Sequence, residues 1–173
     1  MTFGLSLPGG LIALLALVLP LLGALVIGAL KARPNLRETA TLVTAGGTFW
    51  LVLSLLPEIQ AGGRPGIVLA EPLPGIPLAL EVEPLGLLFA LVASFLWIVT
   101  SLYSIGYMRG HNEKHQTRFY VFFAVAISSA LGMAFAGNLF TLFCFYEALT
   151  LCTFPLVTHH QTPAAKRAGR VYL

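Results

Sequence analysis

The sequence predicts an all-α integral membrane protein with five transmembrane helices and a short extracytoplasmic β-hairpin. Hydrophobic residues make up 57% of the 173 residues and charged residues only 10%, which differs strongly from the average of soluble domains. Uncharged stretches long enough to cross the roughly 30 Å apolar core of a bilayer recur along the chain. We therefore expect residues 1–173 to form a single transmembrane domain.

The five expected spans cover about 9–30, 39–56, 85–108, 119–136 and 139–158. The first has no Lys or Arg before its apolar run, and that run is longer than the core of a secretory signal, so we expect a retained helix. Only Gly137 and Asn138 separate the last two spans. A fused helix of about 40 residues would be twice the length that a bilayer requires, and Gly-Asn favours chain reversal. The pair therefore predicts a tight turn.

A long segment between the second and third spans predicts the hairpin. Ile67 to Glu71 and Pro77 to Glu83 flank a Pro74-Gly75 turn signal. The segment also holds four of the seven acidic residues, namely Glu58, Glu71, Glu81 and Glu83. A solvated loop surface is the simplest interpretation of these carboxylates, and an ion-collecting vestibule is the alternative.

The basic residues predict the orientation, because Lys and Arg concentrate in short cytoplasmic loops. Nine of the ten fall on one side of the predicted topology, and Arg64 alone falls on the other. We therefore expect the N-terminus outside and the C-terminus in the cytoplasm, in the inner (plasma) membrane of a cell. The +3 net charge is then a topology signal, and it is not interleaved with aromatic residues as in a nucleic-acid-binding surface.

Small residues recur every four positions in the fourth span and predict a face for close helix packing. They are Ala124, Ser128, Gly132 and Ala136. Ser128 and Ser129 could alternatively hold a water near the membrane centre.

Glu147 is the candidate functional residue, because it stands near the middle of the fifth span, where a charge costs roughly 2.5 to 3.5 kcal/mol. Tyr146, Thr150 and Thr153 fall within the same arc of about 120° at 3.6 residues per turn, and we expect them to hold water or support the carboxylate. Pro155 cannot donate an N–H and is expected to kink the helix nearby. This setting predicts proton transfer at Glu147, and a static packing or salt-bridge role is the alternative.

Other reactive residue types do not form a recognisable site. Cys144 and Cys152 lie inside the fifth span and are expected to be inert thiols. The pairs His111 with His115 and His159 with His160 lack further ligands at metal-site spacing, so we expect no metal. Phosphate loops and nucleophile motifs are missing from the sequence, and we expect no cofactor and no catalytic chemistry in this chain.

Three stretches carry a family resemblance: Ser101-Leu-Tyr-Ser-Ile-Gly-Tyr-Met-Arg109, Arg118-Phe-Tyr120, and Asn138 to Thr150 around Glu147. The chain resembles the antiporter-like subunits shared by respiratory complex I, multisubunit Na⁺/H⁺ antiporters of the D-subunit type and membrane-bound hydrogenases. The resemblance implies a fold of about fourteen helices built from two inverted repeats. It also implies that Glu147 is the fifth-helix glutamate that pairs with a lysine on the seventh helix.

The partner lysine and the second repeat lie outside these 173 residues, so we expect a fragment or one piece of a split subunit. The expected partners are other membrane subunits, including a second polypeptide that supplies the missing helices, and the expected ions are protons and possibly Na⁺. Redox chemistry of an NADH-quinone oxidoreductase-like or hydrogenase-like complex would lie in its other subunits. The alternative is a non-conducting structural subunit. A small multidrug exporter fits less well, because such proteins carry their membrane glutamate in the first helix, which here is uncharged.

Overall fold

The computed structural model describes residues 7–111, 113–159 and 162–172. Within them the elements are α1 (Gly9–Ala29), α2 (Pro34–Ser54), α3 (Leu56–Gln60), β1 (Gly66–Leu73), β2 (Ile76–Glu81), α4 (Pro84–Gly110), α5 (Gln116–Ala134), α6 (Leu139–Val157) and α7 (Pro163–Tyr172). Five stretches are long and apolar enough to cross a membrane: α1, α2 continued by α3, α4, α5 and α6. The predicted fold class is confirmed.

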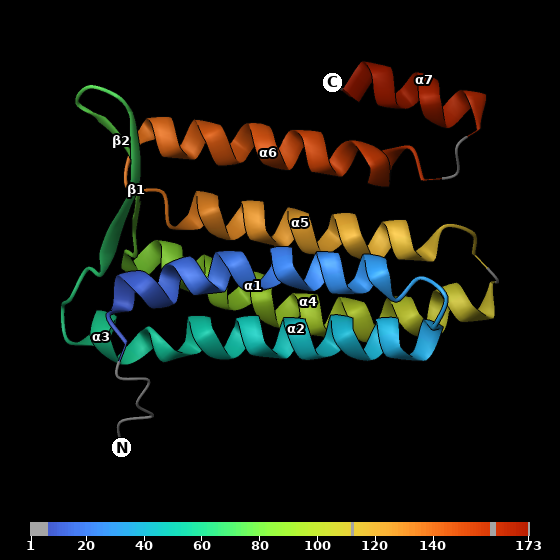
Figure 1. The fold of residues 1–173 in the computed structure, drawn as a ribbon, viewed down its shortest axis with the longest axis horizontal. Helices are drawn as coiled ribbons and strands as arrows, with labels where there is room; N and C mark the ends of the chain where they lie inside the picture. Colours follow the sequence, from blue (N-terminus) through green and yellow to red (C-terminus); the bar gives the residue numbers. More distant parts are fainter. Residues whose placement is uncertain (1–6, 112, 160–161, 173) are drawn as a thin grey trace.

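The spanning helices lie side by side, with the hairpin across one end of the bundle (Figure 1). α1 packs against α2 and α5, α2 packs against α4, and α4 packs against α5. α6 packs on α5 outside this ring. Only 11% of the spanning window of α6 is buried, compared with 50% for α1. α6 is therefore the peripheral helix of the described bundle.

The small residues of α5 allow this close packing. Ala124, Ser128 and Gly132 are buried, and the Ser128 hydroxyl donates a hydrogen bond of 2.8 Å to the carbonyl of Leu17 on α1. A methyl group on Gly132 would collide with the ring of Phe145 on α6. The fourth member of the predicted stripe, Ala136, lies beyond the end of α5 and bridges to Leu80.

The predicted hairpin is present. β1 and β2 are antiparallel, and Gly75 adopts the positive φ of 79° that its turn requires. The strands are fastened to the turn between α5 and α6, because the Glu81 N–H donates to the Phe135 carbonyl (2.8 Å) and the Gly137 N–H donates to the Ala79 carbonyl (2.9 Å). This connection also confirms that the chain reverses between the two helices.

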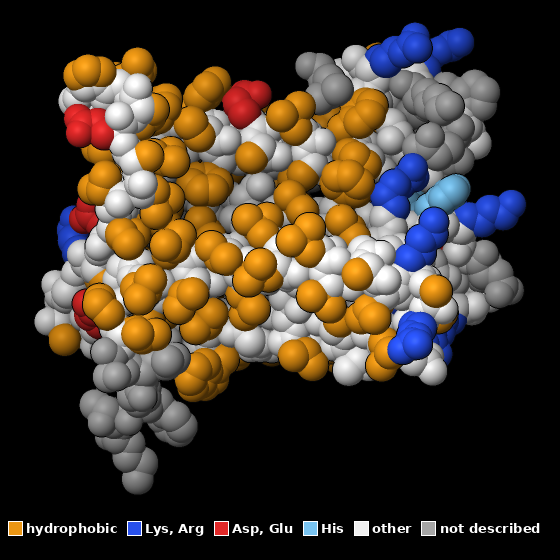
Figure 2. All heavy atoms as spheres, in the orientation of Figure 1, with side chains coloured by type: hydrophobic (Ala, Val, Ile, Leu, Met, Phe, Trp, Pro, Cys, Tyr) orange, Lys and Arg blue, Asp and Glu red, His pale blue; other side chains and the backbone are white. Residues whose placement is uncertain are grey.

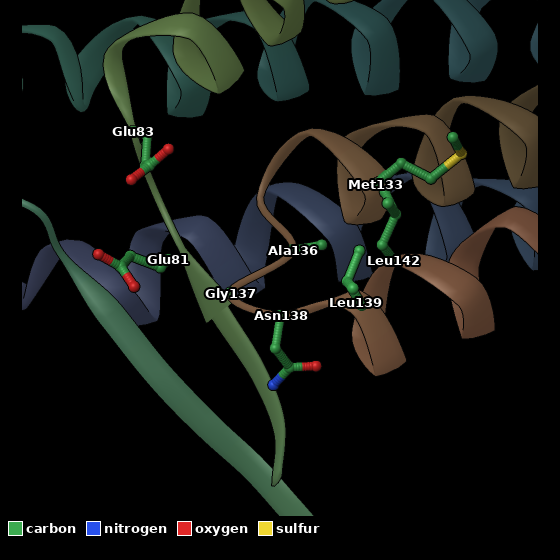
Figure 3. Close-up of a pocket in the computed structure, with 8 residues that line it drawn as sticks. All are labelled: Glu81, Glu83, Met133, Ala136, Gly137, Asn138, Leu139 and Leu142. Atoms are coloured by element: carbon green, nitrogen blue, oxygen red, sulfur yellow. The ribbon is translucent and has the colours of Figure 1, made fainter. Parts of the chain in front are cut away.

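Asn138 joins that turn to the hairpin. Its Oδ1 accepts from the Thr141 N–H at the start of α6 (2.8 Å), and its Nδ2 donates to the Pro77 carbonyl (2.7 Å). Figure 3 shows Asn138 pointing away from Glu81 and Glu83, which line the same shallow pocket of about 310 Å³ from its other side. Both carboxylates lie near Arg64 Nη1, at 4.0 Å and 2.8 Å respectively.

Charge separates along the bundle. Figure 2 shows most of the visible acidic side chains toward the hairpin, one acidic side chain midway along the upper edge, apolar side chains over the middle, and all but one of the visible Lys and Arg side chains at the opposite end. We call these the hairpin end and the basic end. The basic end includes the α1–α2 loop and the start of α5, with Lys31, Arg33, Arg37, Arg109, Lys114 and Arg118.

Candidate functional site

Glu147 lies midway along α6 and is exposed on the surface of the described bundle. Its exposed neighbours on α6 are the apolar Phe143 and Leu151, which are 58% and 63% exposed, and the amphipathic Tyr146, which is 54% exposed. No hydrogen bond or ion pair joins its carboxylate to any residue within 7–111, 113–159 and 162–172. A bare carboxylate amid lipid-facing side chains is costly. It therefore requires a partner, water or a bound proton.

Two of the three residues expected to support Glu147, Thr150 and Thr153, bond to other groups. Thr150 Oγ1 donates to the Tyr146 carbonyl (3.1 Å). Thr153 Oγ1 donates to the Leu149 carbonyl (2.8 Å) and lies 2.8 Å from the hydroxyl of Tyr172. The supporting role of Tyr146, Thr150 and Thr153 stays a prediction.

Pro155 lies within α6, which continues past it to Val157. Because proline has no N–H, the carbonyl of Leu151 lacks its usual helical donor. That carbonyl stands one turn from Glu147 on the side of the basic end. This carbonyl points along the helix toward the basic end, and the predicted kink stays a prediction.

α7 folds back along the basic end of α6 (Figure 1). Gly169 is buried there, and a side chain at this position would collide with Phe154 and Thr158. Tyr172 meets α6 at Thr153, six residues or about 9 Å along the helix from Glu147. α7 therefore covers one end of the outer face of α6 and leaves Glu147 exposed.

The sequence did not predict a second group of charged residues, which lies around Glu38 at the basic end. α2 begins at Pro34, ahead of the uncharged run that starts at Thr39, so Arg37 and Glu38 lie inside the helix and are 4% and 5% exposed. The Glu38 carboxylate accepts from Arg109 Nε (3.1 Å) and Nη2 (2.5 Å) and from Arg37 (3.3 Å). The missed signal was Pro34, because proline is favoured in the first turn of a helix.

Arg37 extends this group to α5. It donates to Gln116 Oε1 (2.8 Å) and Thr117 Oγ1 (3.0 Å), and its guanidinium lies 5.3 Å from the ring centre of Tyr120. α2, α4 and α5 are thus connected by charge-assisted hydrogen bonds at the basic end. This arrangement holds the helices in place and leaves little freedom to Arg37.

The cysteines and histidines do not come together. Cys144 and Cys152 are free thiols, and Cys152 is buried. Among the described residues, no three metal-ligating side chains meet. His160 lies outside the described residues.

Comparison with known proteins finds similarity to subunits of a hydrogenase and of NAD(P)H-quinone oxidoreductases. Residues 74–120 match the family described as NADH-ubiquinone oxidoreductase (complex I), chain 5 N-terminus. Hydrogenase-4 component B of Escherichia coli is 29% identical over 115 residues, which are 66% of this chain and 17% of that protein. NAD(P)H-quinone oxidoreductase chain 5 of Picosynechococcus is 29% identical over 152 residues, which are 81% of this chain and 23% of that protein.

A solved structure shares the fold. The structure of the membrane-bound sulfane sulfur reductase, an archaeal respiratory membrane complex, matches with a TM-score of 0.69 at 19% identity, over 83% of this chain and 22% of that chain. This chain thus spans a quarter or less of the length of these relatives. The resemblance stated from the sequence is confirmed as a similarity: residues 74–120 are similar to the N-terminal part of chain 5 of complex I, and longer stretches are similar to component B of hydrogenase-4 and to an NAD(P)H-quinone oxidoreductase chain 5.

Proposed function

We propose that this chain is the N-terminal part of a subunit that translocates protons, or exchanges protons for cations, in a complex I-like or hydrogenase-like membrane complex. Glu147 is its proton-transfer residue. The observation that carries the proposal is a carboxylate midway along a spanning helix, exposed on an apolar outer face and unpaired within the described residues. Intramembrane carboxylates usually line an ion path or pair with a cation.

The exposed side of α6 is where the rest of such a subunit would pack. Helices placed there would bury Glu147 and bring the lysine that the family resemblance implies, supplied by the same polypeptide or by a second one. A nearby ammonium favours the ionised carboxylate, and its withdrawal in an apolar site favours the protonated acid. Glu147 would then bind and release one proton for each such change.

The polar groups around Glu147 would form hydrogen bonds with water molecules. Thr150, Thr153 and Tyr146 share its side of α6, and the carbonyl of Leu151 has no helical donor. A water needs two to four polar partners. These groups together with the carboxylate supply them on the path between Glu147 and the basic end.

We also propose that the basic end faces the cytoplasm and the hairpin end faces the outside of an inner (plasma) membrane. The distribution of Lys and Arg in Figure 2 supports this orientation. Protons taken up from the cytoplasm would then reach Glu147 along the half of α6 that α7 partly covers.

The test replaces Glu147 in the complete assembled complex. Glu147→Gln keeps shape and hydrogen bonding but cannot exchange a proton, so proton uptake by inverted membrane vesicles should fall at least tenfold per turnover, while Glu147→Asp retains part of it. Glu58→Gln, the same change at an exposed carboxylate of the hairpin end, is the matched control. Normal proton uptake by an assembled Glu147→Gln complex would show that the residue is structural. Repeating the assay with Na⁺ gradients identifies the ion.

A further inference from the structure

A pocket of about 490 Å³ opens at the basic end, between the α1–α2 loop, the start of α2 and the start of α5. Its lining contains Lys31 from the loop, Arg37 from α2, and Glu113, His115 and Arg118 from the chain that leads into α5. Residues about 80 positions apart in the sequence therefore meet around one concave site.

The pocket carries excess positive charge. Three permanent cations line it, namely Lys31, Arg37 and Arg118, against one carboxylate, Glu113. The carboxylate of Glu38 does not restore the balance, because it is shared between Arg37 and Arg109. Arg118 donates to the carbonyl of His159 (2.6 Å), a neutral acceptor that leaves its charge uncompensated.

The beginning of α5 adds to this positive potential. The N-cap residue His115 has a φ of 61° and makes no capping hydrogen bond with its side chain, and the first turn contains no acidic residue. The N-terminal amide groups of a helix and its dipole favour an anion at this place. They act here together with the three cations.

The cationic side of the pocket is fixed in place by the fold. Arg37 is only 4% exposed, and it donates hydrogen bonds to Gln116, Thr117 and Glu38. Because these bonds occupy Nη1 and Nη2, Arg37 contributes fixed positive potential to the pocket and leaves the direct contacts with an anion to Lys31 and Arg118.

Exposed apolar side chains precede and follow the lining residues Lys31 and Arg37 along α1 and α2. Leu25 and Val26, in the last turns of α1 before Lys31, are 72% and 50% exposed, and Leu36, beside Arg37, is 46% exposed. Cations therefore meet lipid-facing side chains at this boundary, as Figure 2 shows for the basic end as a whole. An anionic head attached to acyl chains fits both surfaces, and basic pockets between spanning helices bind such heads.

We propose that this pocket binds the phosphate headgroup of an anionic phospholipid from the leaflet that meets the basic end. The phosphate is bound by Lys31 and Arg118 at the start of α5, with the buried Arg37 adding positive potential from the pocket wall, and the acyl chains run along the exposed leucine and valine side chains of α1 and α2. A bound lipid of this kind would stabilise the contact of the α1–α2 loop and the start of α2 with the start of α5.

The test uses the full chain in its membrane complex, reconstituted in phosphatidylcholine nanodiscs with a photoactivatable phosphatidylglycerol analogue. Labelled peptides are located by mass spectrometry. The read-out is the apparent affinity of the analogue, taken from the labelling of the segments around 31–37 and 113–118 at increasing analogue concentration. The double variant Lys31→Gln/Arg118→Gln should lower this affinity by about fivefold per charge, or roughly 25-fold in total. The matched control is Arg33→Gln/Lys114→Gln, which removes two neighbouring charges outside the pocket and should change labelling less than about threefold.

Competition separates the sources of the phosphate group. Unlabelled phosphatidylglycerol should displace the analogue, while phosphatidylcholine and inorganic phosphate at the same concentration should not. Equal loss of labelling in both double variants would mean that the lipid is attracted by general surface charge and not by the pocket, and this result would overturn the proposal. Displacement by inorganic phosphate would identify a free-anion site, and displacement by phosphatidylcholine would remove the charge requirement, so either result would also overturn it.

Discussion

Asn138 shows how one amide side chain can fix the connection between two spanning helices. Its oxygen caps α6 and its nitrogen bonds to the carbonyl of Pro77 in β2. Thr141, whose N–H it accepts, also receives the N–H of Ala79 on its hydroxyl (3.0 Å). The hairpin and the start of α6 are therefore one hydrogen-bonded unit.

Replacement of Asn138 by Ala should remove both bonds and cost about 1 kcal/mol for the cap and about 1 kcal/mol for the second hydrogen bond. Asn138→Asp keeps the accepting oxygen but loses the donor, so it should lie between Ala and the original residue. Thermal unfolding of the purified complex in detergent measures this order. Equal loss in the two variants would mean that the cap contributes nothing.

The position of Glu147 along its helix could be predicted from the sequence, but its exposure and the hydrogen-bond partners of its neighbours could not. Counting residues from Asn138 places the carboxylate in the middle of α6, and the structure agrees. The exposure of Glu147 depends on which helices pack around α6. The hydroxyls of Thr150 and Thr153 donate to carbonyls of α6 and not to the Glu147 carboxylate. No periodicity within α6 determines either result.

The helix ends at the basic end form a charged junction of α2, α4 and α5. Glu38 lies between Arg37 and Arg109, and all three come from helical segments. Because Arg37 and Glu38 are buried, removal of the Glu38 carboxylate would leave the guanidinium of Arg37 without a counter-charge, whereas Glu38 would keep Arg109 if Arg37 were removed.

Glu38→Gln should therefore destabilise the chain by about 3 to 5 kcal/mol, since it leaves the buried guanidinium of Arg37 without its carboxylate. Glu58→Gln removes an exposed carboxylate and should cost less than about 0.5 kcal/mol. Unfolding midpoints of the two variants in the same detergent provide the comparison. Similar midpoints would show that the junction is hydrated and contributes little.

Helix boundaries explain why this junction was not predicted. The uncharged run begins at Thr39, but Pro34 starts the helix earlier, and the charged turn is then buried by α4 and α5. A hydropathy pattern locates the apolar middle of a span, whereas its polar ends are defined by tertiary contacts. The hairpin was predictable because Pro74-Gly75 and its flanking strands form a local signal.

The whole molecule concentrates its basic residues at one end of the bundle. Arg64 is the only Lys or Arg at the hairpin end among the described residues, while the loops of the opposite end are basic. The packing order, with α6 outside the ring of α1, α2, α4 and α5, gives the chain one incomplete side. Composition predicted the number of spans but not this order, because it results from matching small and large side chains such as Gly132 and Phe145.

The proposed orientation predicts different labelling of two introduced cysteines in intact cells. Leu73→Cys, at the exposed hairpin, should react with a membrane-impermeant maleimide, and Lys114→Cys, at the basic end, should react only after permeabilisation. The unmodified chain, whose Cys144 and Cys152 lie within α6, gives the background. The opposite pattern would reverse the proposed path of protons.

The most direct measurement of the central claim is the infrared difference spectrum of the complex between its resting and turning-over states. If Glu147 binds and releases a proton, a carboxylic-acid carbonyl band should change between the two states, shift in D₂O and vanish in Glu147→Gln, while Glu58→Gln retains it. A spectrum in which every carboxylic-acid band survives in Glu147→Gln would contradict proton transfer at this residue.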